Sequence, residues 1–188
     1  MKQYITLLAV GLTVLTACKK TTNTNANIIT TDYEMPEPQA PIKMAEERSE
    51  KVVKWGEKDY TVMIVRTPID SLAMVTNEYG QEFVDNAIHL TITRTDGSTF
   101  FNRTFTKSSF ASSISEDYRR DGLLTNIRFY EADSNTLTFI ACVNYPQAMD
   151  DEAAILELTI DREGGYSARR NDSYDMRGNW KFGEEETE

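Results

Sequence analysis

Short runs of alternating apolar and polar residues follow one another between residues 51 and 170, and turn residues separate them. Side chains of a β-strand point alternately to its two faces, so each run is typical of a strand with one buried face. About eight strands are expected: Lys51–Trp55, Tyr60–Arg66, Glu82–Arg94, Ser98–Lys107, Leu123–Tyr130, Thr136–Tyr145, Ala153–Asp161 and Tyr166–Arg170. Neighbouring runs are joined by short connections, which predicts an antiparallel meander.

The dipeptide Asp96-Gly97 lies between two of these expected strands. Asp-Gly between β-patterned runs indicates a hairpin, because a type I′ turn requires positive φ at both central residues. We therefore expect a two-residue loop with positive φ at Gly97. The apolar residues around it then define an inner face: Ile88, Leu90, Ile92, Phe101 and Phe105. A slip of one residue in the pairing would turn all of them outward.

One segment, at about residues 109–121, has a helical rather than a β pattern. Phe110, Ile114 and Tyr118 recur every four residues, which places them in one stripe along a helix. Ser109 is suited to cap the start and Gly122 to end the helix. We expect a helix of about three turns lying over a sheet.

These elements predict a mainly β (α+β) fold. One apolar face on each strand favours an antiparallel sheet that curves around a core and is barrel-like, with the single helix covering it. The alternative arrangement is a two-layer β-sandwich.

The first 17 residues form a segment of another kind. After Lys2, residues 4–17 are uncharged and mostly apolar, and as a helix they would measure about 21 Å, too short for a hydrocarbon core of about 30 Å. This length is typical of an export signal. The segment ends in Leu15-Thr16-Ala17-Cys18, which resembles the lipobox of bacterial lipoproteins. Cys18 is therefore the expected site of lipid attachment, and two or more acyl chains would anchor the chain in a membrane.

Removal of residues 1–17 would leave 19 Lys and Arg against 30 Asp and Glu. Such a surface repels phosphates and excludes nucleic acid as a partner class. The residues between 18 and 50 are rich in Thr, Asn, Pro and Glu without an apolar period, which indicates an acylated cysteine followed by a flexible tether. Residues 51–188 are expected to form a single β-rich domain with an acidic C-terminal tail.

Residues 83–110, FVDNAIHLTITRTDGSTFFNRTFTKSSF, combine apolar alternation with Arg-x-Asp-Gly-Ser, Phe-Phe and Phe-Thr-Lys-Ser-Ser-Phe. They resemble an uncharacterised lipoprotein family, a domain of unknown function of the Bacteroides group, and the likeness extends from about Lys54 to Ile160. The resemblance implies no activity, so it supplies no catalytic residues. In lipoproteins of that group, acidic residues just after the acylated cysteine resemble a surface-export signal. Lys19 and Lys20 stand there in this chain, which favours the periplasmic face of the outer membrane.

Residue types that carry chemistry are few. His89 is the single histidine and falls on the polar face of its strand. Cys142 falls on the face opposite Leu137 and Phe139, as a buried thiol would, and without a second cysteine beside Cys18 it can form no disulfide within the chain. Neither ligand spacing nor a glycine-rich phosphate loop is present in the sequence. We therefore predict no catalytic residue, no metal site and no cofactor.

Several aromatic residues are the remaining candidates for binding. They could build a sugar platform, although at strand spacing such residues are more typical of a core or a sheet surface. The residues are Tyr118, Tyr130, Tyr145, Tyr166 and Trp180.

The function predicted from the sequence is that of a non-enzymatic envelope lipoprotein. It would be attached to the membrane through its acyl chains and would bind a protein, a glycan or a small ligand. Two alternatives stay open: a hydrolase that acts on envelope polymers through carboxylates, and a structural subunit of an envelope complex.

The lipid anchor gives a first testable prediction. Replacement Cys18→Ser removes the sulfur that would carry the diacylglyceryl group, so uncleaved precursor should accumulate and labelling with a radioactive fatty acid should be lost. Cys142→Ser is the matched control and should label normally. Undiminished labelling of the Cys18 variant would contradict the prediction.

Overall fold

The structure, a computed structural model, describes residues 39–146 and 153–171. The chain divides into two units, Met1–Pro36 and Glu37–Glu188, and every described residue lies in the second. The predicted signal segment, Cys18, Trp180 and the acidic tail lie outside the described residues. No helix among residues 39–146 and 153–171 is long and apolar enough to cross a bilayer.

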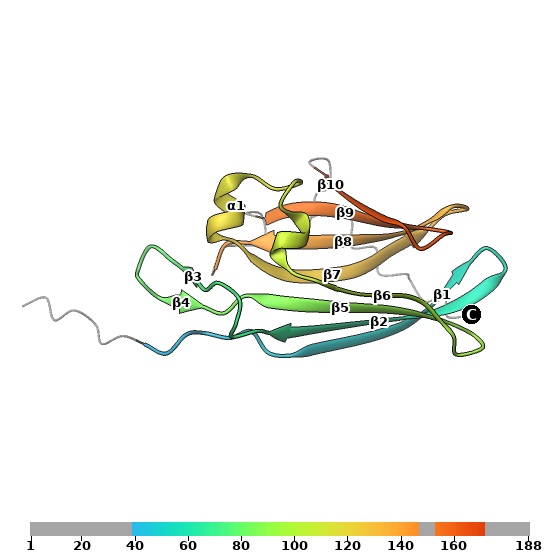
Figure 1. Cartoon of the computed structure of the whole chain (residues 1–188), viewed down its shortest axis with the longest axis horizontal. Helices are drawn as coiled ribbons and strands as arrows, with labels where there is room; N and C mark the ends of the chain where they lie inside the picture. Colours follow the sequence, from blue (N-terminus) through green and yellow to red (C-terminus); the bar gives the residue numbers. More distant parts are fainter. Residues whose placement is uncertain (1–38, 147–152, 172–188) are drawn as a thin grey trace, which may run out of the picture. The chain divides into compact units, whose positions relative to one another are not determined.

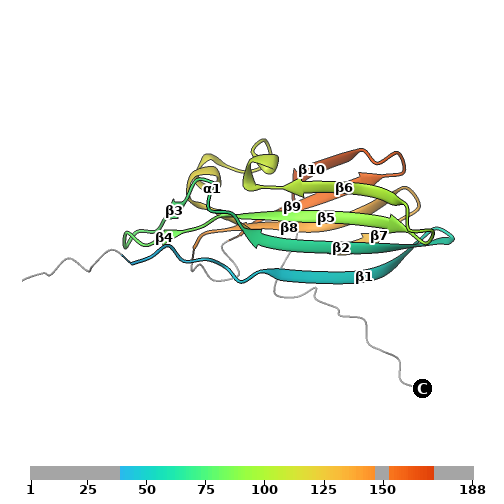
Figure 2. The same ribbon diagram turned by 60° about the horizontal axis from the view of Figure 1, so that its bottom comes forward.

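Most of the described strands belong to two four-stranded antiparallel sheets (Figures 1 and 2). Sheet I has the order β1-β2-β5-β6, and sheet II has the order β10-β9-β8-β7. Sheet I consists of β1 (Glu47–Trp55), β2 (Lys58–Pro68), β5 (Asn86–Arg94) and β6 (Thr99–Phe105). Sheet II consists of β7 (Leu123–Ala132), β8 (Thr136–Asn144), β9 (Ala153–Asp161) and β10 (Tyr166–Arg170). A small pair, β3 (Val75–Thr76) and β4 (Glu82–Phe83), interrupts sheet I between β2 and β5.

The mainly β, antiparallel class is confirmed, and the arrangement is the two-layer one given as the alternative. No closed barrel forms among the described strands, because neither β1 nor β6, the outer strands of sheet I, pairs with a strand of sheet II. After β6 the chain leaves sheet I, passes through two short helices and enters the second layer. One continuous curved sheet would have required β6 to continue directly into a hairpin with β7.

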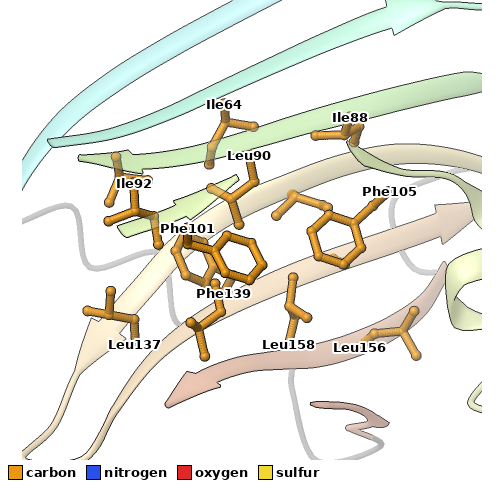
Figure 3. Close-up of a cluster of buried hydrophobic side chains, with 14 of the residues drawn as sticks. Ile64, Ile88, Leu90, Ile92, Phe101, Phe105, Leu137, Phe139, Leu156 and Leu158 are labelled. Atoms are coloured by element: carbon orange, nitrogen blue, oxygen red, sulfur yellow. The ribbon is translucent and has the colours of Figure 1, made fainter. Parts of the chain in front are cut away.

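The core lies between the two sheets, and Figure 3 shows side chains from both of them meeting there. The expected inner face of the Asp96-Gly97 hairpin is confirmed, since its five apolar residues are all buried. Sheet II contributes Leu137, Phe139, Leu156 and Leu158 from β8 and β9, all fully buried. Burying such side chains stabilises the fold by about 1.5–3 kcal/mol each.

The predicted helix is shorter than expected and is divided in two. A 3-10 helix, η1 (Lys107–Phe110), is followed by the α-helix α1 (Glu116–Asp121). One serine of the intervening segment binds a backbone group of another strand: Ser113 Oγ donates to the carbonyl oxygen of Ala168 over 2.9 Å. Serine competes in this way with helical hydrogen bonding. The apolar stripe still faces the core, since Phe110 and Ile114 are buried.

Gly122 ends α1 as predicted, but the reason for glycine at this position is not a positive φ. Its φ is −91°, which any residue can adopt. A Cβ atom there would lie 2.6 Å from the Tyr118 carbonyl oxygen and 2.7 Å from Val143 Cγ1. Glycine is therefore required by the close approach of helix and strand.

The Asp96-Gly97 hairpin is confirmed, with a loop one residue longer than predicted. Gly97 has a φ of +82°. Its N–H donates to the Arg94 carbonyl over 2.9 Å, and the Arg94 N–H donates to the Ser98 carbonyl over 2.8 Å. This pattern is a three-residue loop, in which a turn is followed by a glycine in the left-handed region. The extra residue is accommodated by an irregularity in the pairing between Ile92 and Thr93.

The loop gives a test of backbone strain alone. A Cβ atom at Gly97 would meet nothing within 4 Å, so Gly97→Val should destabilise only through its positive φ, by roughly 1–3 kcal/mol. Gly97→Asn should cost much less, because asparagine tolerates the left-handed region. Urea titration of both variants measures the difference, and equal losses for Val and Asn would contradict the argument.

Candidate functional site

The described residues form a groove of about 420 Å³ where β1, the outer strand of sheet I, lies across from β7, the outer strand of sheet II. We call it the β1–β7 groove. Its volume lies in the range of small-molecule sites, about 300–1,000 Å³. The floor is apolar and comes from three strands: Val62 and Ile64 of β2, Ile88 of β5, and Ile127 and Phe129 of β7.

The wall on the β1 side is polar. Glu47, Ser49 and Lys51 line the groove, and the alternation along β1 places them on the same face as the buried Val53 and Trp55. The first half of β1 therefore directs charged side chains toward the core side of the sandwich. Apolar side chains at the same positions would pack against the floor and close the groove.

Lys51 gives the groove a cation beside an aromatic ring. Its Nζ lies 5.4 Å from the centroid of the Phe129 ring. Arg128, on β7, also lines the groove. An apolar body with an acidic group is therefore the ligand chemistry that the groove complements.

Arg66 lies at one end of the groove with its side chain only 13% exposed. Its Nη1 donates to the Thr125 carbonyl over 2.7 Å and lies 2.9 Å from Glu47 Oε2, and its Nη2 donates to the Ala45 carbonyl over 3.1 Å. The guanidinium thus joins β1, β7 and the segment before β1. Its Nε is buried and has no hydrogen-bond partner among the described residues.

Two more buried polar residues hold β7 against sheet I. Asp85 Oδ1 accepts hydrogen bonds from the backbone N–H groups of Asn86 (2.8 Å) and Leu124 (2.9 Å), and Asn86 Nδ2 donates to the Leu124 carbonyl over 3.0 Å. We refer to Arg66, Asp85 and Asn86 as the polar clamp. It provides Leu124 and Thr125, at the start of β7, with hydrogen bonds that a neighbouring strand would otherwise supply.

A second hollow, of about 300 Å³, lies on the other side of Asp85. Its cations are engaged by acids of this chain: Lys107 with Asp85, Arg119 with Glu116, and Arg120 with Asp117 and Asp121. Burial lowers the pKa of Lys107, and the charge of Asp85, at 3.7 Å, opposes that shift. This hollow is a set of internal ion pairs and offers no uncompensated charge to a ligand.

The residues predicted from sequence as chemical candidates are not brought together. His89 lies on the outer face of sheet I, with its Nδ1 2.9 Å from Thr104 Oγ1. Cys142 is buried in sheet II, on the face predicted for it. No group of three or more His, Cys, Asp or Glu in residues 39–146 and 153–171 is placed to hold a metal.

The aromatic candidates also lie apart. Tyr118 and Tyr145 stack with centroids 4.6 Å apart, whereas Tyr166 packs against Phe101 and Phe105 at the margin of the core. Tyr130 is 45% exposed on sheet II. The described tyrosines therefore form no common platform.

The groove residues were missed by the sequence analysis, although a signal existed. Arg66 continues the inward series of Tyr60, Val62 and Ile64, and an arginine on an apolar strand face indicates a buried or bound charge. In a single strand over Glu82–Arg94, Asp85 would share the polar face of His89, but it is only 3% exposed. Val84 and Asp85 divide the expected strand Glu82–Arg94 into β4 and β5, so the alternation of β5 does not extend to Asp85.

Fold and groove together define a two-sheet antiparallel β-sandwich with a ligand-sized groove at one edge. The chain belongs to the family described as a domain of unknown function, DUF4738, whose model matches residues 28–168. A family of unknown function is what the resemblance of residues 83–110 implied, and that part of it is confirmed. No curated protein matches this chain.

The polar clamp gives a prediction on stability. Arg66→Lys keeps the charge but cannot maintain contacts with Thr125, Ala45 and Glu47 together, so it should lower the free energy of unfolding by about 1–3 kcal/mol. Arg48→Lys is the matched control in the neighbouring strand. Its exposed ion pair with Glu50 should contribute less than about 1 kcal/mol. Equal effects in urea titrations would show that Arg66 does not hold the two sheets together.

Proposed function

We propose that this chain is a lipid-anchored protein of the bacterial cell envelope that binds a ligand in the β1–β7 groove. The observation that carries the binding role is the groove itself, with an apolar floor and a cationic group over Phe129. The anchor rests on the lipobox-like end of the N-terminal segment and on the resemblance to Bacteroides-group lipoproteins. Lys19 and Lys20 favour attachment at the periplasmic face of the outer membrane.

The arrangement of acids in the groove favours binding over hydrolysis. Glu47 and Glu50 both line it, but they are three residues apart on one strand and so point to opposite faces of β1. Each is bonded to an arginine, Arg66 or Arg48. A carboxylate hydrolase instead needs two acids that face each other across the substrate.

The ligand class can be tested with octanoate and 1-octanol, which share an alkyl chain and differ in charge. We use the mature chain carrying Cys18→Ser, labelled with ¹⁵N. Both probes should shift amide resonances of Ile127 and Phe129, and octanoate should bind more tightly because its carboxylate reaches Lys51. Lys51→Gln should weaken octanoate binding about two- to fivefold and leave octanol binding unchanged.

Lys54→Gln is the matched control, since Lys54 lies on the same strand but faces away from the groove. It should alter neither affinity. If neither probe shifts groove resonances, or if the two lysine variants behave alike, the proposed ligand site is wrong.

A further inference from the structure

The open edge of β1 carries the further inference. β1 pairs along all nine of its residues with β2, and no other described strand lies beside it. On β7, the polar clamp occupies backbone groups of Leu124 and Thr125 at the start of the strand. An uncovered strand edge is a template for another chain.

The direction of the backbone groups on β1 follows from its hairpin with β2. Trp55 and Lys58 face each other across the two-residue loop Gly56-Glu57, and the residues that close such a loop are a hydrogen-bonded pair. Alternation along the strand then directs the N–H and C=O groups of Ser49 toward β2. Those of Arg48 and Glu50 point toward the open edge.

Within residues 47–51, positions at equal distances from the central Ser49 carry opposite charges. The order is Glu47, Arg48, Ser49, Glu50 and Lys51. In an antiparallel pair of identical strands with Ser49 opposite Ser49, Glu47 lies opposite Lys51 and Arg48 opposite Glu50, each pairing occurring twice. Four cross-strand pairs of opposite charge result, and the small serines meet on the axis.

We propose that two copies of this chain associate through β1, paired antiparallel about a two-fold axis at Ser49. The pairing joins the two copies of sheet I into one continuous sheet. Arg48 and Glu50 of the two copies exchange backbone hydrogen bonds. Their side chains are 63% and 56% exposed in the single chain, where they pair with each other, and in the dimer they exchange this ion pair for the two pairs between copies.

Other two-fold registers fit the charges less well. A two-fold axis between antiparallel strands is perpendicular to the sheet, so residues opposite each other must come from the same face of their strands. The numbers of two paired residues therefore have an even sum. Registers centred on Arg48, Glu50 or Lys51 place like charges directly opposite each other, which is destabilising. A register centred on Val52 forms only two ion pairs, between Glu50 and Lys54.

The association has a consequence for the groove. A two-fold axis perpendicular to the joined sheet places both copies of sheet II on the same side of it, so the two β1–β7 grooves open toward each other. Glu47 of each copy then pairs with Lys51 of the other copy, at the wall that the two grooves share. This shared chamber rests on the proposed ligand role, whereas the pairing of the strands does not.

Sedimentation equilibrium of the mature chain carrying Cys18→Ser, from micromolar to millimolar concentration, tests the association. We expect a monomer–dimer equilibrium. Arg48→Glu replaces two attractive pairs by two repulsive ones and should raise the dissociation constant about tenfold or more. The double variant Arg48→Glu with Glu50→Arg restores the opposite charges and should restore dimerisation.

Oxidative cross-linking identifies the register. Ser49 opposite Ser49 is a non-hydrogen-bonded pair with Cα atoms about 4.5 Å apart, within the range of a disulfide. Ser49→Cys should therefore give a cross-linked dimer, whereas Val52→Cys should not, and Lys54→Glu should leave the dimer intact. Circular dichroism confirms that each variant is folded.

A chain that stays monomeric at millimolar concentration overturns the proposal. A dimer that is insensitive to Arg48→Glu, or that cross-links through Val52→Cys, overturns it as well. Octanoate binding by a monomeric chain would leave the proposed ligand site standing and remove only the shared chamber.

Discussion

The polar clamp joins the two layers of the sandwich, and the rest of the structure depends on this junction. Hydrophobic burial draws the sheets together but is non-directional. The hydrogen bonds of Asp85 and Asn86 to Leu124, and of Arg66 to Thr125, fix where β7 lies on sheet I. Because buried polar groups must be satisfied, a displaced β7 would leave several of them without partners. The groove is the space that remains beyond the clamp, where β1 and β7 are not joined.

Most strands of this fold could be predicted from sequence because apolar and polar residues alternate along them. Residues 153–161 and 166–170 alternate without interruption, and their predicted bounds agree with β9 and β10. The division into two sheets could not be predicted in the same way. A closed sheet and a sandwich bury the same alternating faces, and they differ in whether the outer strands of the two sheets pair with each other. Such pairing joins strands that are distant in the sequence or separated by the helical connection between β6 and β7, so the alternation within one strand does not reveal it.

The candidate site was harder to predict than the fold. Residue types that commonly catalyse are the most visible candidates in a sequence, but here His89 and Cys142 lie on different sheets. The groove depends instead on common residue types at strand positions where apolar residues are expected. Lys51 occupies an inward position of β1, and Arg66 ends the apolar face of β2. Their meaning depends on which strand lies opposite, and that contact joins residues about 60 positions apart in the chain, as Arg66 and Thr125 are.

The chain passes from sheet I to sheet II only once. Sheet I is complete at Phe105, and all of sheet II comes from residues 123–170. During synthesis, which proceeds from the N-terminus, a whole sheet is therefore present before any residue of its covering layer. Leu90, Ile92 and Phe105, fully buried in the finished protein, would face water throughout that interval. The nascent chain thus passes through a stage in which exposed apolar surface makes it prone to aggregation, and this stage ends only when β8 and β9 cover sheet I.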